Sequence, residues 1–321
     1  MKNLKKILSM VLVVAMLATM ATLFAGCGKS TYTVGILQLV DHEALDAATE
    51  GFKQALIDRL GEENVKFDYQ NAAGDTNTCT TIANNFVTKN VDLIMANATP
   101  ALQACAGATT TIPILGTSVT EYGVALNIEN FSGVTGYNVS GTSDLAPLDE
   151  QAQMILDLFP EAKTVGMLYC SAEANSAYQV KVVKDYLESR NITVKEFKFS
   201  DSNDVQAVTE NAASSCDVIY IPTDNTAASC TETINNVCQP KKVPIVAGEA
   251  GICCGCGTVT LSISYYELGY KTGEMAADIL EGKASIESMA IAYDPKPVKK
   301  YNKAICDALG ITVPEGYTPL D

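Results

Sequence analysis

Short apolar runs alternate with longer helical patterns along most of the chain. The stretch TYTVGILQLV is strand-like, and HEALDAATEGFKQALIDRLG then places apolar residues at near-helical spacing up to a stopping Gly61. Further strands are predicted at NVKFDYQNA, VDLIMANA and IPILGTSV, with a helix at TNTCTTIANNFVTKN. Strict alternation of this kind predicts an α/β fold with a parallel sheet covered by helices on both faces.

The second half of the chain repeats this order. KTVGMLYCS, ITVKEFKFSD, CDVIYIPTD and VPIVAGEAG read as strands, separated by helices near residues 176–190, 205–213 and 227–237. Individual residues match too: Val34-Gly35 corresponds to Val165-Gly166, and Asp75 to Asp201. A repeat this long predicts a duplicated domain. We expect two Rossmann-like lobes whose strand-end loops face each other across a cleft, since ligands bind beyond the carboxyl ends of parallel strands.

The pattern changes after Gly257, where one strand and one long helix are followed by a short tail. We expect the helix at 267–280 to pack on the first lobe and the tail on the second. Lobe 1 is therefore predicted at 32–145 plus about 264–287, and lobe 2 at 146–263 plus about 288–321. Crossings near 143–147, 261–264 and 288–292 would form a three-stranded hinge.

The first residues predict export. Three lysines precede an apolar run that closes on LFAGCGKS, as in a secretory signal peptide at 1–26. A permanent membrane anchor is the alternative, although the run is at or below the ~20 residues that a span needs. The residues before Cys27 resemble a bacterial lipobox, which would acylate Cys27, leave 27–31 as a tether and anchor the protein to the extracytoplasmic face of the membrane.

The net charge argues against nucleic acid as a partner. The chain carries 37 acidic and 22 basic residues, a formal net charge of −15, and removal of the signal peptide would take three lysines away. No basic surface is thus available to displace the counterions of a nucleic acid.

Several segments together resemble the ABC-transporter substrate-binding proteins of the tryptophan/tyrosine-type family. These segments are GILQLVDHEALDAATEGFKQAL, DYQNAAGD, NATPALQA, EANS, PTDNT, GEAG and LSISYYELGYKTGEMAADIL, and the resemblance runs from about Tyr32 to Ile311. It implies a type 1 periplasmic-binding fold that delivers a small solute to a permease powered by a cytoplasmic ATPase. Members with an assigned ligand tend to bind aromatic or branched hydrophobic amino acids. The chain departs from the pattern at Glu43, where Pro is common, and in GEAGICCGCGT, a loop that usually lacks Cys.

An amino-acid ligand needs partners for its carboxylate and its ammonium once water is expelled. The chain has two arginines, Arg59 and Arg190, both on predicted outer helices, so a bidentate Arg clamp is not expected. The carboxylate would rely on backbone N–H groups at helix starts and on polar side chains. The candidates are Thr99, Ser118, Thr120, Asn175 and Ser176.

Carboxylates at strand ends are the natural partners of the ammonium. Asp224 in PTDNT is the first candidate, followed by Glu249 and then Glu173. Asp224 has a competing role as the N-cap of the next helix, and Asn225 and Thr226 share that ambiguity.

Other polar and aromatic residues have two interpretations each. Gln38 would point into the cleft, either to bind ligand or to serve lobe closure alone. His42 would contact the ligand from its loop or face solvent. Tyr220, Tyr265 and Tyr266 could flank an aromatic ligand, although the alternation around Tyr220 is typical of a buried strand.

The cysteines and the missing motifs argue against an enzyme. Ten cysteines remain besides Cys27, and we expect most to be free thiols that fill the core. CCGC lacks the second pair of ligands that a tetrahedral metal site needs, so we expect no metal and no cofactor. Neither G-x-S-x-G nor a G-x-x-x-x-G-K-[ST] loop is present.

The sequence thus predicts a monomeric, lipid-anchored solute receptor of an ABC importer. The alternatives are an exported sensor that presents its ligand to a membrane receptor and a thiol-metal protein.

Overall fold

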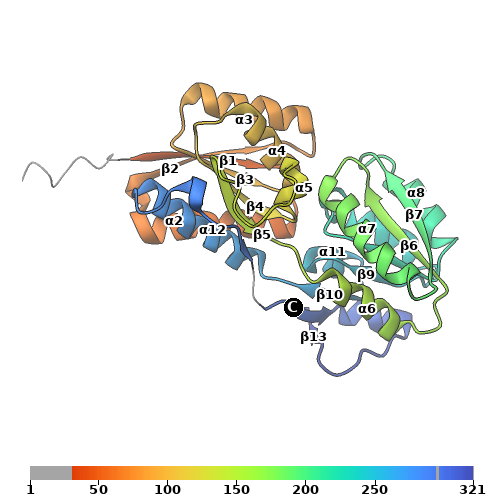
Figure 1. Cartoon of the computed structure of the whole chain (residues 1–321). Helices are drawn as coiled ribbons and strands as arrows, with labels where there is room; N and C mark the ends of the chain where they lie inside the picture. Colours follow the sequence, from red (N-terminus) through yellow and green to blue (C-terminus); the bar gives the residue numbers. More distant parts are fainter. Residues whose placement is uncertain (1–30, 294–295, 321) are drawn as a thin grey trace, which may run out of the picture.

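The computed structural model describes residues 31–293 and 296–320. The expected signal peptide, Cys27 and all but the last residue of the expected tether lie outside these residues. Two α/β lobes lie side by side and are joined by crossing segments (Figure 1). Within the described residues, no helix is long and apolar enough to cross a membrane.

Lobe 1 is built on a six-stranded parallel sheet with the order β11-β5-β4-β3-β1-β2. Its elements are β1 (Tyr32–Gln38), α2 (Glu43–Leu60), β2 (Val65–Asn71), α3 (Thr76–Lys89), β3 (Leu93–Asn97), α4 (Thr99–Ala108), β4 (Ile114–Val119), α5 (Tyr122–Leu126), β5 (Val139–Ser143), α12 (Tyr265–Leu280) and β11 (Ala292–Tyr293). Short 3₁₀ turns occupy Glu62–Asn64 and Ile286–Ser288. As the pattern predicted, α2 ends at Gly61, whose positive φ of 88° suits a residue without a side chain.

Lobe 2 has a seven-stranded sheet with the order β13-β12-β10-β9-β8-β6-β7. Its elements are α6 (Leu148–Leu158), β6 (Thr164–Cys170), α7 (Ala174–Glu188), β7 (Thr193–Phe199), α8 (Val205–Ala213), β8 (Val218–Ile221), α9 (Asn225–Ala228), α10 (Thr231–Cys238), β9 (Ile245–Ala247), α11 (Ala250–Gly255), β10 (Val259–Ser262), β12 (Val298–Tyr301), α13 (Lys303–Leu309) and β13 (Thr318–Pro319). The predicted α/β class with two lobes is confirmed, with one antiparallel pairing, β10 with β12, that the pattern did not predict.

Two predicted boundaries were wrong. The single helix expected at 227–237 is divided into α9 and α10, which are separated by Ser229 and Cys230. The third crossing was expected near 288–292, but β11 pairs in parallel with β5 of lobe 1. The chain is therefore still part of lobe 1 at Tyr293 and pairs within lobe 2 from Val298.

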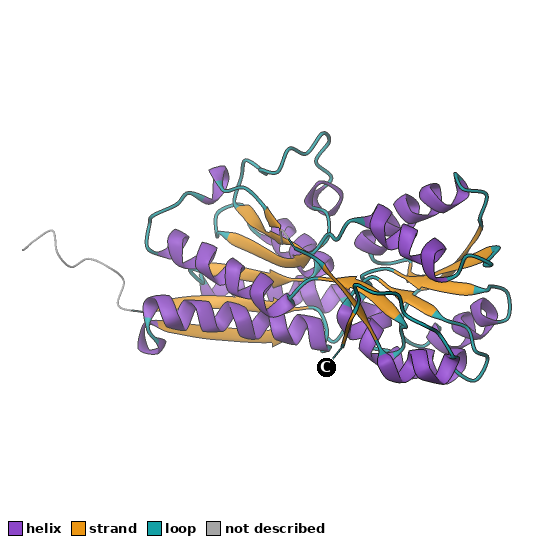
Figure 2. Cartoon of the chain, turned by 90° about the horizontal axis from the view of Figure 1, so that it is seen from below, coloured by secondary structure: helices purple, strands orange, loops and turns teal. Residues whose placement is uncertain are grey.

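The other two crossings follow strands that end at the cleft. One joins β5 to α6 through residues 144–147, and the other joins β10 to α12 through residues 263–264. Figure 2 shows them in the middle of the molecule, between the two sheets. As expected, the long helix α12 returns to lobe 1, where it packs along α2.

Glycines allow α2 and α12 to approach closely. A Cβ added at Gly269 would lie 1.9 Å from the carbonyl oxygen of Ala48, and one at Gly51 would lie 2.1 Å from the carbonyl oxygen of Tyr266. No side chain fits between backbones at these distances. The close pair fixes the position of α12, whose N-terminus begins directly after the second crossing.

We expect Gly269→Ala to lower the free energy of unfolding by about 1–3 kcal/mol, because overpacking must push the two helices apart. Gly107→Ala in α4 is the matched control, since a Cβ there meets nothing within 4 Å. The control should leave stability unchanged or raise it by about 0.5–1 kcal/mol, as Ala is the better helix former. Urea unfolding measures both variants, and equal stabilities would contradict the close packing.

Candidate functional site

The carboxyl ends of strands from both lobes meet at a small cavity. Lobe 1 and the start of α12 provide His42, Leu45, Ser118, Asp144 and Tyr265, and lobe 2 provides Thr223, Asp224, Asn225, Ala228 and Glu249. The cavity measures ≈ 10 Å³, which is room for about one water-sized group. The predicted arrangement, with matching strand ends across one cleft, is therefore present.

Asp144 is the carboxylate with unused bonding capacity. It follows β5 directly, is 4% exposed, and its Oδ2 accepts a hydrogen bond of 3.0 Å from the Tyr265 hydroxyl. Its Oδ1 is buried without a partner. Burial raises the pKa of Asp144 to about 6, against the lowering effect of the Thr120 and Tyr265 side chains. A buried acceptor without a partner is costly, so this oxygen is suited to a donor that comes from outside the protein.

Asp144 lies in a stretch that was predicted as a hinge crossing, and it was not among the predicted site residues. The signal was available, since Asp144 is an acid at the end of a predicted crossing strand, in GTSDLAP. The same rule that selected Asp224 and Glu249 would have selected it.

Glu249 lies after β9 and caps α11. Its carboxylate accepts the backbone N–H of Gly251 at 2.6 Å and that of Ile252. Burial raises the pKa of Glu249 to about 7, and Glu43 and Asp144 contribute in the same direction. The GEAGICCGCGT segment is thus a capped short helix, where the sequence analysis had expected a loop.

Asp224 is a structural cap. Its Oδ1 accepts from the N–H of Ala227 at 2.8 Å, and its Oδ2 accepts from the Cys170 N–H and the Ser176 hydroxyl, both at 2.7 Å. Burial, followed by the nearby Glu173, raises the pKa of Asp224. Both oxygens are occupied inside lobe 2. Two roles were predicted for Asp224, helix capping and ligand binding. The contacts in the structure are those of a helix cap.

Glu173 ties the loop after β6 to the start of α9. Its Oε1 accepts from the N–H and hydroxyl of Thr226, both at 2.9 Å. Its Oε2 accepts from the N–H of Asn225 at 3.0 Å, from Nδ2 of Asn225 at 2.6 Å and from Nδ2 of Asn175 at 3.2 Å. Five donors leave this carboxylate with no bonding site to offer the cleft.

Among the described residues, the acids of the site have no cationic partner. None of the ion pairs in the described part of the chain includes Asp144, Glu173, Asp224 or Glu249. Each is at most 4% exposed. The cleft therefore gathers carboxyl groups whose ionised forms burial disfavours and a cationic ligand group would stabilise.

The predicted hydroxyl donors of lobe 1 lie near strained backbone. Ser118 has a positive φ of 53° and a buried hydroxyl without a partner, and it lines the cavity. Thr99 opens α4 after Ala98, whose φ is 91°, and its buried hydroxyl also lacks a partner. Such outliers collect at functional sites because surrounding contacts hold them. Thr120 is buried, and its side chain lowers the pKa of Asp144.

Other candidates are used inside one lobe. Gln38 donates to Asp46 at 2.6 Å and accepts from Thr49 at 2.6 Å, so its amide is satisfied within lobe 1 and does not line the cavity. Tyr220 is core, with its hydroxyl 2.6 Å from Gln151 Oε1. Tyr266 stacks on Tyr270 and does not line the cavity.

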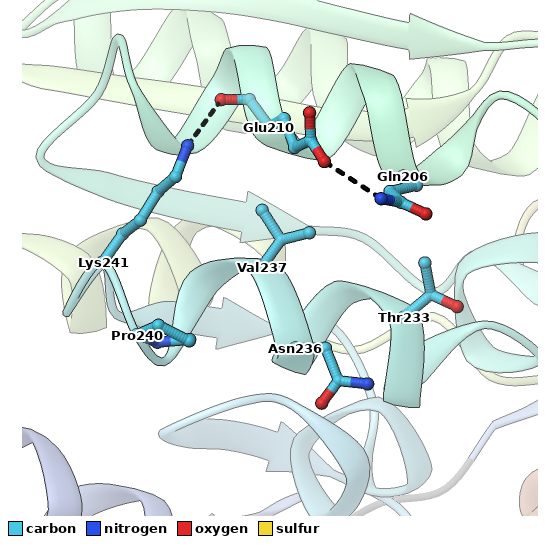
Figure 3. A pocket seen from close by; sticks show the side chains of 7 residues that line it. All are labelled: Gln206, Glu210, Thr233, Asn236, Val237, Pro240 and Lys241. Carbon is cyan, nitrogen blue, oxygen red and sulfur yellow. Dashed lines mark hydrogen bonds between the residues drawn. The ribbon is translucent and has the colours of Figure 1, made fainter.

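Two further hollows have different surroundings. One of ≈ 350 Å³ lies between the lobes and shares Asn225 with the small cavity, and Leu39, Val40 and Pro100 form part of its wall. The other, of ≈ 640 Å³, lies between α8 and α10 of lobe 2 alone (Figure 3). There Glu210 accepts from Gln206 at 3.0 Å, and no described lining residue has a buried polar atom without a partner. The second hollow is not a candidate ligand site.

The ten described cysteines are free thiols. Burial raises the pKa of Cys253 and Cys256 well above the ordinary thiol value, so both are protonated at neutral pH. Among the described residues, no three His, Cys, Asp or Glu side chains are placed to hold a metal ion.

Comparison with known proteins agrees with this geometry. The family model for ABC transporter substrate binding proteins matches residues 33–318. A tyrosine-binding protein of Clostridioides difficile (strain R20291) is 39% identical over 261 residues, which covers 80% of this chain and 74% of the relative.

Two solved structures show both lobes. An ABC domain from Streptococcus pneumoniae in complex with L-Trp has a TM-score of 0.85 at 32% identity and covers 90% of this chain and 100% of its own. A ligand-free, open substrate-binding protein with adhesive properties from Clostridium difficile has a TM-score of 0.67 at 36% identity, with coverage of 91% and 99%. Because the family match spans nearly the whole chain, this protein belongs to the ABC transporter substrate-binding proteins.

Proposed function

We propose that this substrate-binding protein captures an aromatic α-amino acid, such as tyrosine or tryptophan, for an ABC importer. The tyrosine-binding relative and the solved L-Trp complex support the ligand class. The observation that carries the proposal is the free oxygen of Asp144, buried in a cation-free cavity between the lobes.

An ammonium group fits this cavity in size, charge and bonding. The cavity has room for about one water-sized group, and its wall includes three buried polar atoms without partners: Oδ1 of Asp144, Oγ of Ser118 and Nδ1 of His42. An ammonium has three N–H donors, and its positive charge would hold Asp144 and Glu249 in their ionised forms. We therefore assign Asp144, rather than Asp224, as the ammonium partner.

The rest of the ligand would extend into the ≈ 350 Å³ hollow beside the cavity. Thr99 opens α4 with a buried hydroxyl that lacks a partner, and it would receive the carboxylate, since a helix N-terminus suits an anion. Leu39, Val40 and Pro100 give the hollow an apolar wall for a side chain. Its volume lies within the range of small-molecule sites.

The lobes are close together in this structure. His42 of lobe 1 lies 3.3 Å from Asn225 of lobe 2, and the chain matches the L-Trp complex better than the open, ligand-free relative. Binding would then proceed by hinge closure, in which a ligand held by one lobe recruits the other and the closed form docks on the permease.

The protein would work at the outer face of the membrane, consistent with a family whose members act outside the cytoplasm. Acylation at Cys27 would anchor it there as a monomer, next to a permease and its ATPase. Metabolic labelling with a fatty acid, compared between the natural chain and Cys27→Ala, tests the anchor, and labelling that persists in Cys27→Ala would refute it.

Thermal-shift assays should show stabilisation by L-tyrosine or L-tryptophan, because a ligand selective for the folded state raises its melting temperature. Asp144→Asn keeps the shape of the side chain but removes its charge, so it should weaken the better of these ligands by about 2–5 kcal/mol in calorimetry. Asp149→Asn, at an exposed position in the first turn of α6, is the matched control and should bind normally. Stabilisation by sugars but not by amino acids would overturn the ligand class.

Asp224→Ala should lower the free energy of unfolding of the ligand-free protein by about 1–3 kcal/mol, because three buried donors lose their acceptor. Asp75→Ala provides the comparison, since Asp75 caps α3 at an exposed site through Thr78 N–H and should cost about 1 kcal/mol. Chemical unfolding without ligand separates the two roles of Asp224. If Asp224→Ala left stability unchanged but weakened ligand binding, Asp224 rather than Asp144 would be the partner of the ligand's ammonium.

A further inference from the structure

His42 stands at a helix N-cap, but its side chain does not cap the helix. It is the N-cap residue of α2, yet it makes no capping hydrogen bond. Its ring instead reaches across the cleft, with Nε2 3.3 Å from Oδ1 of Asn225 in lobe 2. The ring also lines the small cavity, and its Nδ1 is buried without a partner.

Asn225 can present only its oxygen to His42. Its Nδ2 donates to Oε2 of Glu173 at 2.6 Å, and that oxygen also accepts from two other N–H groups. A flipped amide would place its carbonyl oxygen against the carboxylate of Glu173, where two acceptors would face each other. The amide orientation therefore follows from Glu173, and Oδ1 is the atom that faces the imidazole.

An acceptor at Asn225 requires a donor at Nε2. In a neutral imidazole one nitrogen carries the hydrogen and the other accepts, so a hydrogen on Nε2 leaves a lone pair on Nδ1. Burial lowers the pKa of His42, although the bond to Asn225 and the charges of Glu173, Asp46 and Asp41 oppose this effect. Asp144, Asp224 and Glu249 also line the cavity that His42 faces.

We propose that His42 is a specificity-determining residue: its neutral ring, held by Asn225, accepts a hydrogen bond at Nδ1 from the ligand's amino group. This inference rests on the proposed function and deepens it. His42 belongs to lobe 1 and Asn225 to lobe 2, so the correct tautomer is fixed only when the lobes close. The amino group would then bond two residues of lobe 1, Asp144 and His42, while lobe 2 orients one of them.

The arrangement makes ligand binding sensitive to acid. A protonated ring carries a hydrogen on Nδ1 and a positive charge, and both oppose an ammonium. In the open form the ring should titrate near its ordinary pKa of about 6.5, and the bound ring should titrate lower. Binding must therefore expel a proton below about pH 6.5, so the His42 contribution weakens affinity up to about tenfold for each further pH unit.

Nuclear magnetic resonance tests the tautomer directly, because His42 is the only histidine in the sequence. Long-range ¹H–¹⁵N spectra of the complete protein with L-tyrosine or L-tryptophan at pH 7.5 should show a protonated Nε2 and an unprotonated Nδ1. An imidazolium, or a hydrogen on Nδ1, in the complex would overturn the proposal.

Two substitutions separate the nitrogens. His42→Gln extends an amide toward the Nε2 position and lacks the Nδ1 acceptor, whereas His42→Asn places an amide oxygen near the Nδ1 position. By calorimetry at pH 7.5, we expect His42→Gln to bind the better of the two amino acids about tenfold more weakly, since one ligand donor loses its partner. His42→Asn should recover part of that loss. Thermal melting without ligand establishes that both variants fold.

The pH profile supplies a readout that a merely structural role would not change. Between pH 7.5 and 5.5 the natural chain should lose about tenfold more affinity than His42→Gln. Asp144 and Glu249 titrate in both proteins, so their effect on affinity cancels in this comparison. Parallel profiles and equal affinities would refute the role of His42 while leaving the proposed function intact. Failure of both amino acids to bind the natural chain would instead remove the proposed function, and this inference with it.

Discussion

Burial of carboxylates without a cation is the constraint on which this site depends. Asp144, Glu173, Asp224 and Glu249 come from loops after strands of both lobes, and lobe closure removes them from water. In Asp224, Glu173 and Glu249 the cost of burial is offset within the protein, because backbone N–H groups and hydroxyls donate hydrogen bonds to their oxygens. Asp144 keeps one oxygen unbonded, and the ammonium of the proposed ligand would supply its donor. We infer that the closed state is complete only with a cationic ligand in it.

The duplicated fold explains why this constraint arises at the interface. Parallel strands deliver their carboxyl ends, and the polar loops that follow them, to one edge of each sheet. Two copies joined by crossing segments bring those edges together (Figures 1 and 2). The close contact of α2 with α12 fixes the start of α12, where Tyr265 bonds Asp144. A packing feature of the outer helices thus holds the carboxylate of Asp144 in place.

The sequence predicted the architecture better than the roles of single side chains. Periodicity and the repeat were sufficient for two lobes and a shared cleft, because strand and helix patterns are local. Whether Asp224 caps a helix or meets a ligand depends on Cys170 and Ser176, which are about 50 residues away in sequence and reach it only in the folded lobe. Gln38 was expected at the cleft, yet Asp46 and Thr49 occupy its amide. The role proposed for His42 depends on the orientation of Asn225, which no sequence pattern encodes.

The requirement for a ligand cation is tested most directly by removing the amino group and nothing else. Calorimetry at pH 7.5 should compare L-tyrosine with 3-(4-hydroxyphenyl)propionate, and L-tryptophan with indole-3-propionate. The account predicts that the deaminated compound binds at least about 30-fold more weakly, since a buried charge pair is lost and Asp144 keeps an unbonded oxygen. Equal affinities for an amino acid and its deaminated counterpart would contradict it.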